Sequence, residues 1–442
     1  MNIAYITTDF GVPVFGYKGA SIHVREMVRA MRREGHNVHI ISPAMHRGKD
    51  DEKNSNFGEE GIDATAAYEI VIPPPEAELP DDPQLGKLTC VSVLPTPLHV
   101  SIIRELRQVD KLLEADTRLR HEIRNLLYNK ALYDAIDGYL AAENIDFVYE
   151  RYALFSMTGI RLARKLGVPH VLEVNAPLAF EQERMRGLEM KQFALQMEKQ
   201  IFQLTDRVLV VSDELGEFVK SCGVNSDQIE VVPNAVDPAR FDIPENGDSV
   251  RETLGLQDKT VAGFVGSLKN WHGTETLLRA FLQVHTDLPD LHLLIVGDGP
   301  ERENLEKLAA HSGISQRVTF TGKVTYGEIP RYLAAMDIAA APYIPHDNFY
   351  FSPIKIFEYM AMGIATIGAK IGQVKSIVHH GETGMLFEPG NVNQLVHLLT
   401  TLTTDSRLRE RLGKNAKTWV LKERTWQNNA RKVVGIVKSL KA

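Results

Sequence analysis

The sequence predicts an α/β protein with two doubly wound domains, each built on a parallel sheet covered by helices on both faces. Three observations support this class. Short apolar runs of strand length alternate with helical patterns along the whole chain, which is typical of parallel sheets. A chain of 442 residues is longer than one hydrophobic core usually supports. A stretch rich in Pro, Asp and Gly, residues 233–247, divides the apolar runs into two sets.

Ten apolar runs carry the strand prediction. The first set comprises residues 3–6, 38–41, 147–149, 171–174 and 208–211, and the second comprises residues 261–265, 291–296, 318–320, 338–341 and 365–367. We expect a Rossmann-like domain over residues 1–236, a linker over 237–247 and a second Rossmann-like domain over 248–420. Because ligands bind beyond the carboxyl ends of such strands, the functional site is expected in a cleft between the domains.

Two regions depart from this alternation. Residues 44–98 form an insertion rich in charge, Gly and Pro, which we interpret as a loop over the cleft or a partly mobile segment. Residues 101–140 carry apolar positions at helical spacing and predict one long helix or two consecutive helices. The basic residues of this stretch fit peripheral contact with an anionic membrane, but interleaved acidic residues favour a solvated helix face.

The composition restricts the class of partner. The formal net charge is −7, with acidic and basic residues interspersed, which gives no basis for a nucleic-acid partner. The only cysteines, Cys90 and Cys222, offer neither a disulfide framework nor a CxxC metal site, and they suit a reducing compartment. The first residues lack the pattern of a signal peptide, and no uncharged apolar run reaches about 18 residues. We therefore expect a cytoplasmic protein.

The segment 352–363, SPIKIFEYMAMG, combines a helix start with charged side chains. Ser352 is a good N-cap and Pro353 suits the first helical position, so the free N–H groups of Ile354, Lys355 and Ile356 would attract an anion. Lys355 adds a positive charge beside those amides. The segment thus predicts a phosphate-binding helix start.

Glu358 lies about one turn after Lys355 and is placed to accept hydrogen bonds from vicinal hydroxyls such as those of a ribose. A diphosphate site beside a ribose site indicates a nucleotide. The alternative is an ordinary amphipathic helix whose apolar face packs on a core.

Other motifs accompany this segment in a regular order. They are GHNVHIISP at 35–43, VVPNAV at 231–236, GSLKNWHG at 266–273, GDGPERE at 297–303 and GETGMLF at 381–387. Together they resemble glycosyltransferase family 4, of the GT-B fold, in a subgroup with an SPxKxxEYMAxG donor-site helix. The resemblance covers nearly the whole chain. It implies that the last helix, residues 421–442, returns to the N-terminal domain.

The resemblance also implies the reaction. Family members transfer a sugar from a nucleoside-diphosphate donor, here UDP- or GDP-linked, to an acceptor that is a sugar, a lipid-linked molecule or another small molecule. They retain the anomeric configuration, and the departing diphosphate is thought to take the acceptor's proton on the same face.

One departure from the family pattern concerns cations at the donor site. Most members carry an Arg after the first Gly of the 266–273 segment and a Lys before its last Gly, whereas this chain has Ser267 and His272 there. Lys355 would then carry more of the diphosphate charge. Lys269 and His272 are candidate helpers, the histidine either protonated or as a neutral hydrogen-bond donor.

A second departure concerns the acid that contacts the transferred sugar. Many members place this acid eight residues before the residue that corresponds to Glu358, but here that position is Tyr350. Either the Tyr350 hydroxyl or Asp347 would have to replace it. Asp347 also fits an exposed loop position with no role in the site.

Loops at strand ends supply the remaining expected donor contacts. Gly297 and Gly299 directly follow an apolar run, where ligand clefts form. In related enzymes the backbone after a later strand holds the base, and small residues before the first helix let the backbone approach the phosphates. The residues concerned are Lys323 and Val324 for the base, and Gly19 and Ala20 for the phosphates.

Polar residues also end two strands of the first set. Glu150 and Arg151 follow one apolar run, and Glu173 and Asn175 lie at the end of the next. Many family members offer a His to the donor or acceptor sugar in this region, and we expect these four residues to replace it. The alternative is an Arg151–Glu173 ion pair that only fixes the loop.

No Asp-x-Asp, HExxH or Cys/His cluster with ligand spacing is present, so we expect no metal and no tightly bound cofactor. Three other functions stay open. A GT-B sugar-nucleotide epimerase would need no acceptor, and a catalytically silent nucleotide-sugar-binding protein would fit the missing acid and cations. A Rossmann oxidoreductase is disfavoured because no intact GxGxxG with a following acid appears.

Overall fold

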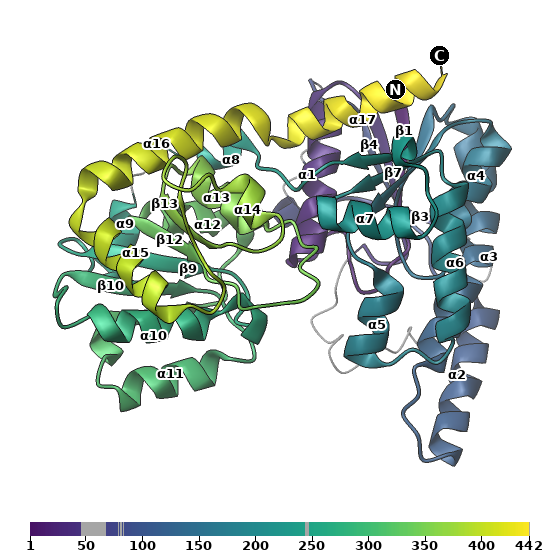
Figure 1. Cartoon of the computed structure of the whole chain (residues 1–442). Coiled ribbons are helices and arrows are strands. Elements are labelled where there is room, and N and C mark those ends of the chain that lie inside the picture. The colour runs from purple at the N-terminus through teal and green to yellow at the C-terminus, as the bar shows by residue number, and fades with distance from the viewer. Residues whose placement is uncertain (46–67, 78, 80–81, 83, 244–246, 442) are drawn as a thin grey trace. The chain divides into compact units, whose positions relative to one another are not determined.

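The computed structural model describes residues 1–45, 68–77, 79, 82, 84–243 and 247–441 (Figure 1). The chain divides into two compact units. Unit 1 comprises Met1–Val232 together with Asn429–Ala442, and unit 2 comprises Pro233–Asn428. Each unit is described separately below.

Unit 1 contains an eight-stranded sheet in its described part, in the order β3-β4-β2-β1-β5-β6-β7-β8. Neighbouring strands run parallel, except that β3 is antiparallel to β4. In the register of the central strands, Tyr5 lies between Ile40 and Tyr149. The strands are β1 Asn2–Thr7, β2 Asn37–Ser42, β3 Glu69–Val71, β4 Leu88–Ser92, β5 Phe147–Arg151, β6 His170–Val174, β7 Arg207–Val210 and β8 Ile229–Val231.

Helices cover both faces of this sheet. Figure 1 shows α1 on one face and α3 and α4 on the other. On the face of α3 and α4, Ala4, Ile6 and Val148 pack with Leu132 and Leu162 into one buried cluster, which follows from the alternation of apolar side chains along each strand. The helices are α1 Gly19–Arg33, α2 Pro97–Leu112, α3 Leu119–Ala142, α4 Thr158–Leu166, α5 Leu178–Arg186, α6 Lys191–Leu204 and α7 Asp213–Ser221.

Unit 2 contains a six-stranded sheet in its described part, in the order β11-β10-β9-β12-β13-β14, and all its neighbouring strands are parallel. The strands are β9 Thr260–Val265, β10 Leu291–Val296, β11 Val318–Gly322, β12 Ile338–Ala341, β13 Ala365–Ala369 and β14 Met385–Phe387. Every residue of β10 is buried, as expected for a central strand of a sheet covered on both faces.

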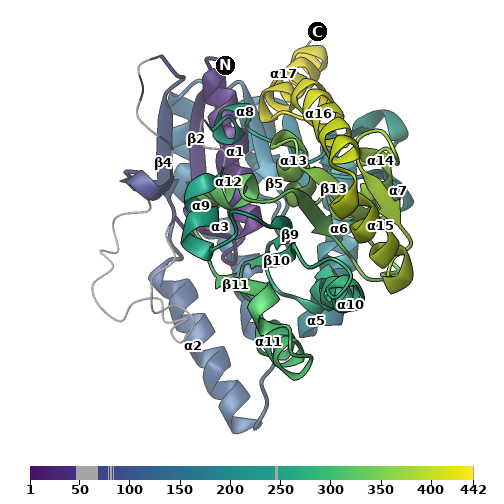
Figure 2. The same cartoon turned by 90° about the vertical axis from the view of Figure 1, so that its left-hand side faces the viewer.

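The helices of unit 2 also lie on both faces of the sheet. Figure 2 shows α10 and α11 on one side of β9 and β10, and α12 and α13 on the other. Phe264, Phe281 and Phe357 belong to one fully buried core cluster. The helices are α8 Pro238–Phe241, α9 Asp248–Leu254, α10 Thr274–Val284, α11 Arg302–His311, α12 Ile329–Ala334, α13 Ile354–Ala361, α14 Val374–Ile377, α15 Val392–Thr404 and α16 Ser406–Glu423, followed by α17 Trp426–Lys441.

The predicted fold class is confirmed, because both units are doubly wound and their sheets are parallel except at the edge strand β3. Nine of the ten predicted runs lie wholly within strands, and the run 208–211 lies in β7 except for its last residue, Val211. The stretch 101–140 forms two helices, α2 and α3, with Glu114 between them at a positive φ of 50°. The segment 237–247 lies in unit 2, where the side chain of Asp237 caps α8.

The interpretation of residues 44–98 as an excursion was wrong for their last part. The run LTCVSV at 88–93 contains β4, which pairs in parallel with β2, and Cys90 and Val91 are buried. This apolar run lies inside a polar stretch. It extends the sheet because it is long enough to form a strand and its side chains can be buried. Residues 46–67 of the insertion lie outside the described residues.

The C-terminal segment 429–442 groups with unit 1. Arg431 forms an ion pair with Glu34 at 2.8 Å, Lys432 contacts Glu230 at 3.1 Å, and Lys441 contacts Asp146 at 3.0 Å. These contacts join the end of α17 to α1, β8 and the turn before β5.

Candidate functional site

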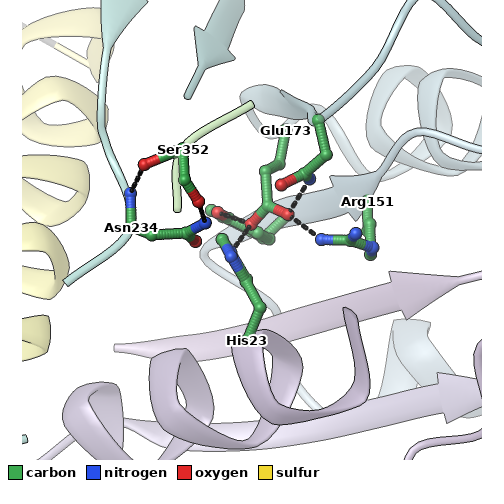
Figure 3. Close-up of polar contacts among 7 residues, drawn as sticks. His23, Arg151, Glu173, Asn234 and Ser352 are labelled. Carbon is green, nitrogen blue, oxygen red and sulfur yellow. Dashed lines mark hydrogen bonds and ion pairs between the residues drawn. The ribbon is translucent and has the colours of Figure 1, made fainter. Parts of the chain in front are cut away.

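The start of α13 has a different arrangement from the one predicted. Pro353, rather than Ser352, is the N-cap, and no side chain caps the helix. The Ser352 hydroxyl accepts a hydrogen bond from the Asn234 backbone N–H at 2.9 Å, and the Ser352 carbonyl accepts one from the Asn234 side-chain amide at 2.6 Å (Figure 3). The predicted cap was wrong because Asn234, remote in sequence, occupies the Ser352 hydroxyl.

The first amides of α13 are partly free. The N–H of Ile356 donates to the Pro353 carbonyl at 3.1 Å, so it is not available to a ligand. Within the described residues, the N–H groups of Ile354 and Lys355 make no such backbone bond. Both residues are half-buried, whereas Ile356 and the rest of α13 are buried. Two of the three predicted amides therefore remain at an accessible helix start.

The charged group of Lys355 in unit 2 has unusual surroundings. Its Nζ is enclosed and has no hydrogen-bond partner among the described residues, although the residue as a whole is half-buried. The ammonium lies 4.0 Å from the centre of the Phe264 ring and 5.6 Å from that of Tyr343. Burial lowers the pKa of Lys355 to about 7, and the nearby carboxylate of Glu358 opposes this shift only in part. A buried ammonium without a counter-ion is unfavourable in the free protein.

Glycine residues in the loops after β9 and β10 let the backbone lie close to the Lys355 ammonium. Gly266, directly after β9, has a φ of 141°, and a Cβ there would lie 2.7 Å from the Lys355 Nζ. Gly297, directly after β10, has a φ of 137°, and its Cβ would lie 2.0 Å from the Gly266 carbonyl oxygen. A Cβ on Gly299 would lie 2.6 Å from the Leu268 backbone. These loops can pack at the strand ends only with glycine at these positions.

His272 is neutral in this environment. Burial and the cation of Lys355 lower the pKa of His272 to about 2. Its Nδ1 lies within hydrogen-bond distance of the Ser267 carbonyl oxygen, so Nδ1 carries the proton. In the free protein these surroundings favour the neutral form of His272 over the protonated alternative, because the neighbouring ammonium makes a second positive charge unfavourable. Lys269 and Ser267 are exposed.

The other residues predicted for unit 2 have mixed surroundings. Glu358 is buried on α13, and its carboxylate is close enough to affect the pKa of Lys355. Tyr350 is buried with its ring 4.4 Å from that of Phe351, whereas Asp347 is exposed. Lys323 is exposed and Val324 is half-buried after β11.

In unit 1, the buried carboxylate of Glu173 is the common partner of several polar side chains. Glu173 of β6 accepts hydrogen bonds from Arg151 at 2.5 Å and from the Tyr149 hydroxyl at 2.5 Å, and it also accepts one from Asn175. His23 Nε2 of α1 lies 2.8 Å from the same carboxylate. Figure 3 shows Glu173 between His23 and Arg151. Three of the four residues predicted at these strand ends, Arg151, Glu173 and Asn175, are thus brought together, whereas Glu150 is not.

The charge of Glu173 is stabilised by its partners. Burial alone would raise the pKa of Glu173, but His23, Arg151 and the hydrogen bonds outweigh it and hold that pKa well below its usual range. The Arg151–Glu173 ion pair is present, as the structural alternative requires. Around it, the hydroxyls of Tyr5, Thr7 and Ser21 are buried without hydrogen-bond partners among the described residues. Such hydroxyls fit a place where ligand hydroxyls or water would bind.

Two residues of these sites were missed by the sequence reasoning. His23 lies on α1 and not at a strand end, so position gave no signal for it. Asn234 belongs to the VVPNAV motif, which was noted but given no role. Glu150 points the other way: it bonds to His170 at 3.0 Å and to the Ser156 hydroxyl at 2.6 Å. This direction follows from the alternation of side chains along β5.

The helix start near Gly19 also differs from the expectation. α1 begins at Gly19, so Gly19 and Ala20 lie in its first turn and not in the preceding loop. Gly19 is exposed, and a Cβ there would meet nothing within 4 Å. Its backbone is thus open to a ligand, but its packing does not require glycine.

No group of three or more His, Cys, Asp or Glu side chains in the described residues is placed to hold a metal ion. Across the same residues, no helix combines the length and apolar composition needed to cross a membrane.

Both units match known family models. Residues 18–235 match the glycosyl transferase 4-like domain, and residues 248–419 match glycosyl transferases group 1.

Curated relatives agree with these matches. The chain is 26% identical over 261 residues to 2-deoxystreptamine glucosyltransferase of Streptomyces kanamyceticus, covering 56% of this chain and 65% of that protein. It is 26% identical over 216 residues to a GDP-mannose-dependent α-(1-6)-phosphatidylinositol monomannoside mannosyltransferase of Mycolicibacterium smegmatis, covering 48% and 56%. The chain thus spans less than two thirds of the length of these relatives.

Solved structures share the fold over nearly the whole chain. Sucrose-phosphate synthase of Thermosynechococcus elongatus aligns with a TM-score of 0.68 at 19% identity, covering 99% of this chain and 98% of that one. Anabaena HepE in complex with UDP and glucose aligns with a TM-score of 0.67 at 17% identity, covering 99% and 100%. With the two parallel sheets and both family matches, the chain belongs to the glycosyltransferases of group 1, with a family 4-like N-terminal domain and the GT-B fold.

Proposed function

We propose that this chain is a retaining glycosyltransferase that transfers a hexose-type sugar from a UDP- or GDP-linked donor to an acceptor not yet identified. The observation that carries the proposal is the Nζ of Lys355, an enclosed cation without a partner in the described residues. It stands beside two accessible amides at the start of α13. A diphosphate would supply the missing counter-charge.

Each donor group has a role in this proposal. Lys355 and the amides of Ile354 and Lys355 bind the diphosphate, whose negative charge grows as the sugar leaves. Gly266 and Gly297 let the loops after β9 and β10 approach it. Glu358 accepts hydrogen bonds from the ribose hydroxyls. Neutral His272, whose Nδ1 proton is held by Ser267, presents its Nε2 as a hydrogen-bond acceptor.

The transfer step follows from these roles. The bond between the anomeric carbon and the diphosphate oxygen breaks, and the acceptor oxygen bonds to that carbon on the same face. The proton of the acceptor hydroxyl passes to the departing diphosphate oxygen. The protein positions both substrates and stabilises charge, and the proposal assigns it no nucleophile.

In unit 1 we assign the Glu173 group to sugar hydroxyls. Arg151, Asn175 and His23 hold the Glu173 carboxylate in one orientation. The unpartnered hydroxyls of Tyr5 and Thr7 on the same face of the sheet supply further hydrogen-bonding groups. On this assignment the ion pair is part of the binding site and does more than fix a loop.

Two further assignments belong to the proposal. We assign the chain to the subgroup with the SPxKxxEYMAxG pattern, and the sequence of the donor helix supports this assignment. We also propose a cytoplasmic site of action, since both cysteines are free, which suits a reducing compartment. The base is open, because one relative is GDP-mannose-dependent and one structural neighbour binds UDP.

Calorimetry and product analysis test the proposal. We expect either UDP or GDP to bind, and its sugar conjugate to release the diphosphate only when an acceptor is present. An epimerase would change the sugar without net cleavage, and a silent binder would release nothing. Failure of both nucleotides to bind would refute the proposal.

A further inference from the structure

An arginine without an acidic partner lies at the carboxyl end of the unit 1 sheet, on the face covered by α3. The Tyr128 hydroxyl of α3 donates to the Val93 carbonyl, just beyond β4, at 2.6 Å. The Tyr128 ring meets that of Phe10, just beyond β1, edge-on at 5.0 Å. One turn before Tyr128, the guanidinium carbon of Arg124 lies 4.1 Å from the centre of the Phe10 ring. The carboxyl ends of β1 and β4 therefore hold Arg124 at the edge where parallel sheets bind ligands.

The hydrogen bonds of Arg124 leave its charge uncompensated. Its Nε and one terminal nitrogen donate to the Asn125 side-chain oxygen at 3.1 and 2.9 Å. The Asp9 carboxylate, which accepts from the Gly11 N–H at 2.7 Å, is near enough to compensate this charge only in part. No acid of the described residues forms an ion pair with Arg124. Burial lowers the pKa of Arg124 to about 10, so the environment disfavours its charge.

Neighbouring basic residues increase the positive electrostatic potential around Arg124. His121 lies on the same face of α3, one turn before Arg124, and burial together with nearby arginines lowers the pKa of His121 to about 4. Among these arginines, Arg120 is paired with Asp110 at 2.6 Å, and Arg118 donates to a backbone carbonyl. Arg124 is thus the cation of this group that lacks both an acid and a backbone carbonyl as partner in the described structure.

We infer that Arg124 binds an anionic oxygen group, a phosphate or a carboxylate, carried by the acceptor. The inference rests on the proposed glycosyl transfer, because it names the acceptor's chemical class. The planar guanidinium forms paired hydrogen bonds to such groups, and stacking on Phe10 fixes its plane. Neutral His121 offers one further ring N–H. An anion there would remove the unfavourable accumulation of positive charge.

Binding of a simple anion tests the inference without an acceptor. The Lys355→Met protein lacks the donor-site cation, and it is titrated with inorganic phosphate under phosphorus NMR, and with acetate as the carboxylate probe. We expect saturable binding of one of the two, at least about tenfold weaker after a second change, Arg124→Gln. The tighter probe identifies the class of anion.

Two variants control for packing. Arg161→Gln is the matched control, because the Arg161 guanidinium lies 4.1 Å over the Tyr133 ring in the same manner but on α4. It should leave phosphate and acetate binding unchanged. Arg124→Lys keeps the positive charge but loses the paired N–H donors of the guanidinium, so an intermediate affinity for the anion is expected. Thermal melts check that each variant is folded. Binding that is absent before Arg124 is changed, or unaffected by changing it, would overturn the inference.

Steady-state kinetics separates this inference from the proposed function. With an active acceptor, Arg124→Gln should raise the acceptor KM at least about tenfold while the donor KM stays constant. If the protein binds UDP or GDP but the acceptor KM is unchanged in Arg124→Gln, only the anion site is refuted. A protein that binds neither nucleotide would refute the proposed transfer, whatever Arg124 binds.

Discussion

Replacing Lys355 by Met should make the free protein more stable and its nucleotide binding weaker. Methionine has a similar length and fits between the rings of Phe264 and Tyr343 without a charge. A residue that only supports the fold would show the opposite effect on stability, since its removal would lower the free energy of unfolding.

The size of the effect follows from the pKa of Lys355. That pKa falls from 10.5 to about 7, and each unit corresponds to about 1.4 kcal/mol. At pH 7 the enclosed ammonium therefore costs the free protein up to about 4 kcal/mol, an upper bound because the structure can relax around it. Each 1 kcal/mol shifts the Tm of a domain of 150–250 residues by about 2–4 °C, so a clear rise in Tm is expected. Loss of the direct ammonium–phosphate contact should weaken nucleotide binding by about 1.5–3 kcal/mol.

Calorimetry on the same samples measures both effects. Differential scanning gives Tm, and titration with UDP or GDP gives Kd. Lys414→Met is the control, since Lys414 is exposed on α16 and should change neither quantity. A lower Tm together with unchanged affinity would show that Lys355 is a structural residue, and the donor-site reasoning would fail.

Four other outcomes are expected. Nucleotide affinity of the wild type should fall as pH rises above about 7, because the diphosphate binds the protonated form of Lys355; titrations in buffers of different ionisation enthalpy should show proton uptake, which Lys355→Met abolishes. Glu358→Gln should remove turnover while leaving Tm nearly unchanged, and a fully active variant would contradict its ribose contact. Asn234→Ala should lower the free energy of unfolding by about 1–3 kcal/mol, because the Ser352 carbonyl loses its buried partner; an unchanged denaturation midpoint would exclude this role. Transfer should persist after treatment with EDTA, and its loss and recovery with added metal would reverse the expectation of a metal-free reaction.

Burial of a carboxyl also gives a stability test in unit 1. Burial raises the pKa of Glu198 to about 7, above its usual value of 4.5. A raised folded-state pKa means that stability is lost as pH rises through about 7, since the carboxylate must then ionise in a buried place. Glu198→Gln should therefore raise Tm more at pH 8 than at pH 5, and an equal change at both would contradict the assignment.

Much of the fold was predictable because strand and helix patterns are local. Buried parallel strands appear as short apolar runs whatever their neighbours, and each of the ten predicted runs coincides with a strand to within one residue. The short β4 was missed because its apolar run lies inside a long polar stretch, and the polar composition of the whole stretch predicted a loop. Only its pairing with β2 shows that it completes the sheet.

The sequence also determined which chemical groups are available at the strand ends. Arg151, Glu173 and Asn175 were predicted together because strands of a parallel sheet end at one edge. Lys355 and Glu358 were predicted from one helix, since their spacing alone puts them about one turn apart. These predictions need no knowledge of the distant chain.

Only the tertiary structure decided the partners of these groups. Ser352 looked like an N-cap, but Asn234, 118 residues away in sequence, occupies its hydroxyl. His23 reaches Glu173 from 150 residues away, and no local pattern shows that α1 packs on β6. The enclosure of the Lys355 ammonium likewise depends on Phe264 and Tyr343, which come from separate segments. Period and propensity act over a few residues, whereas burial and charge compensation depend on which distant segments the folded chain brings into contact.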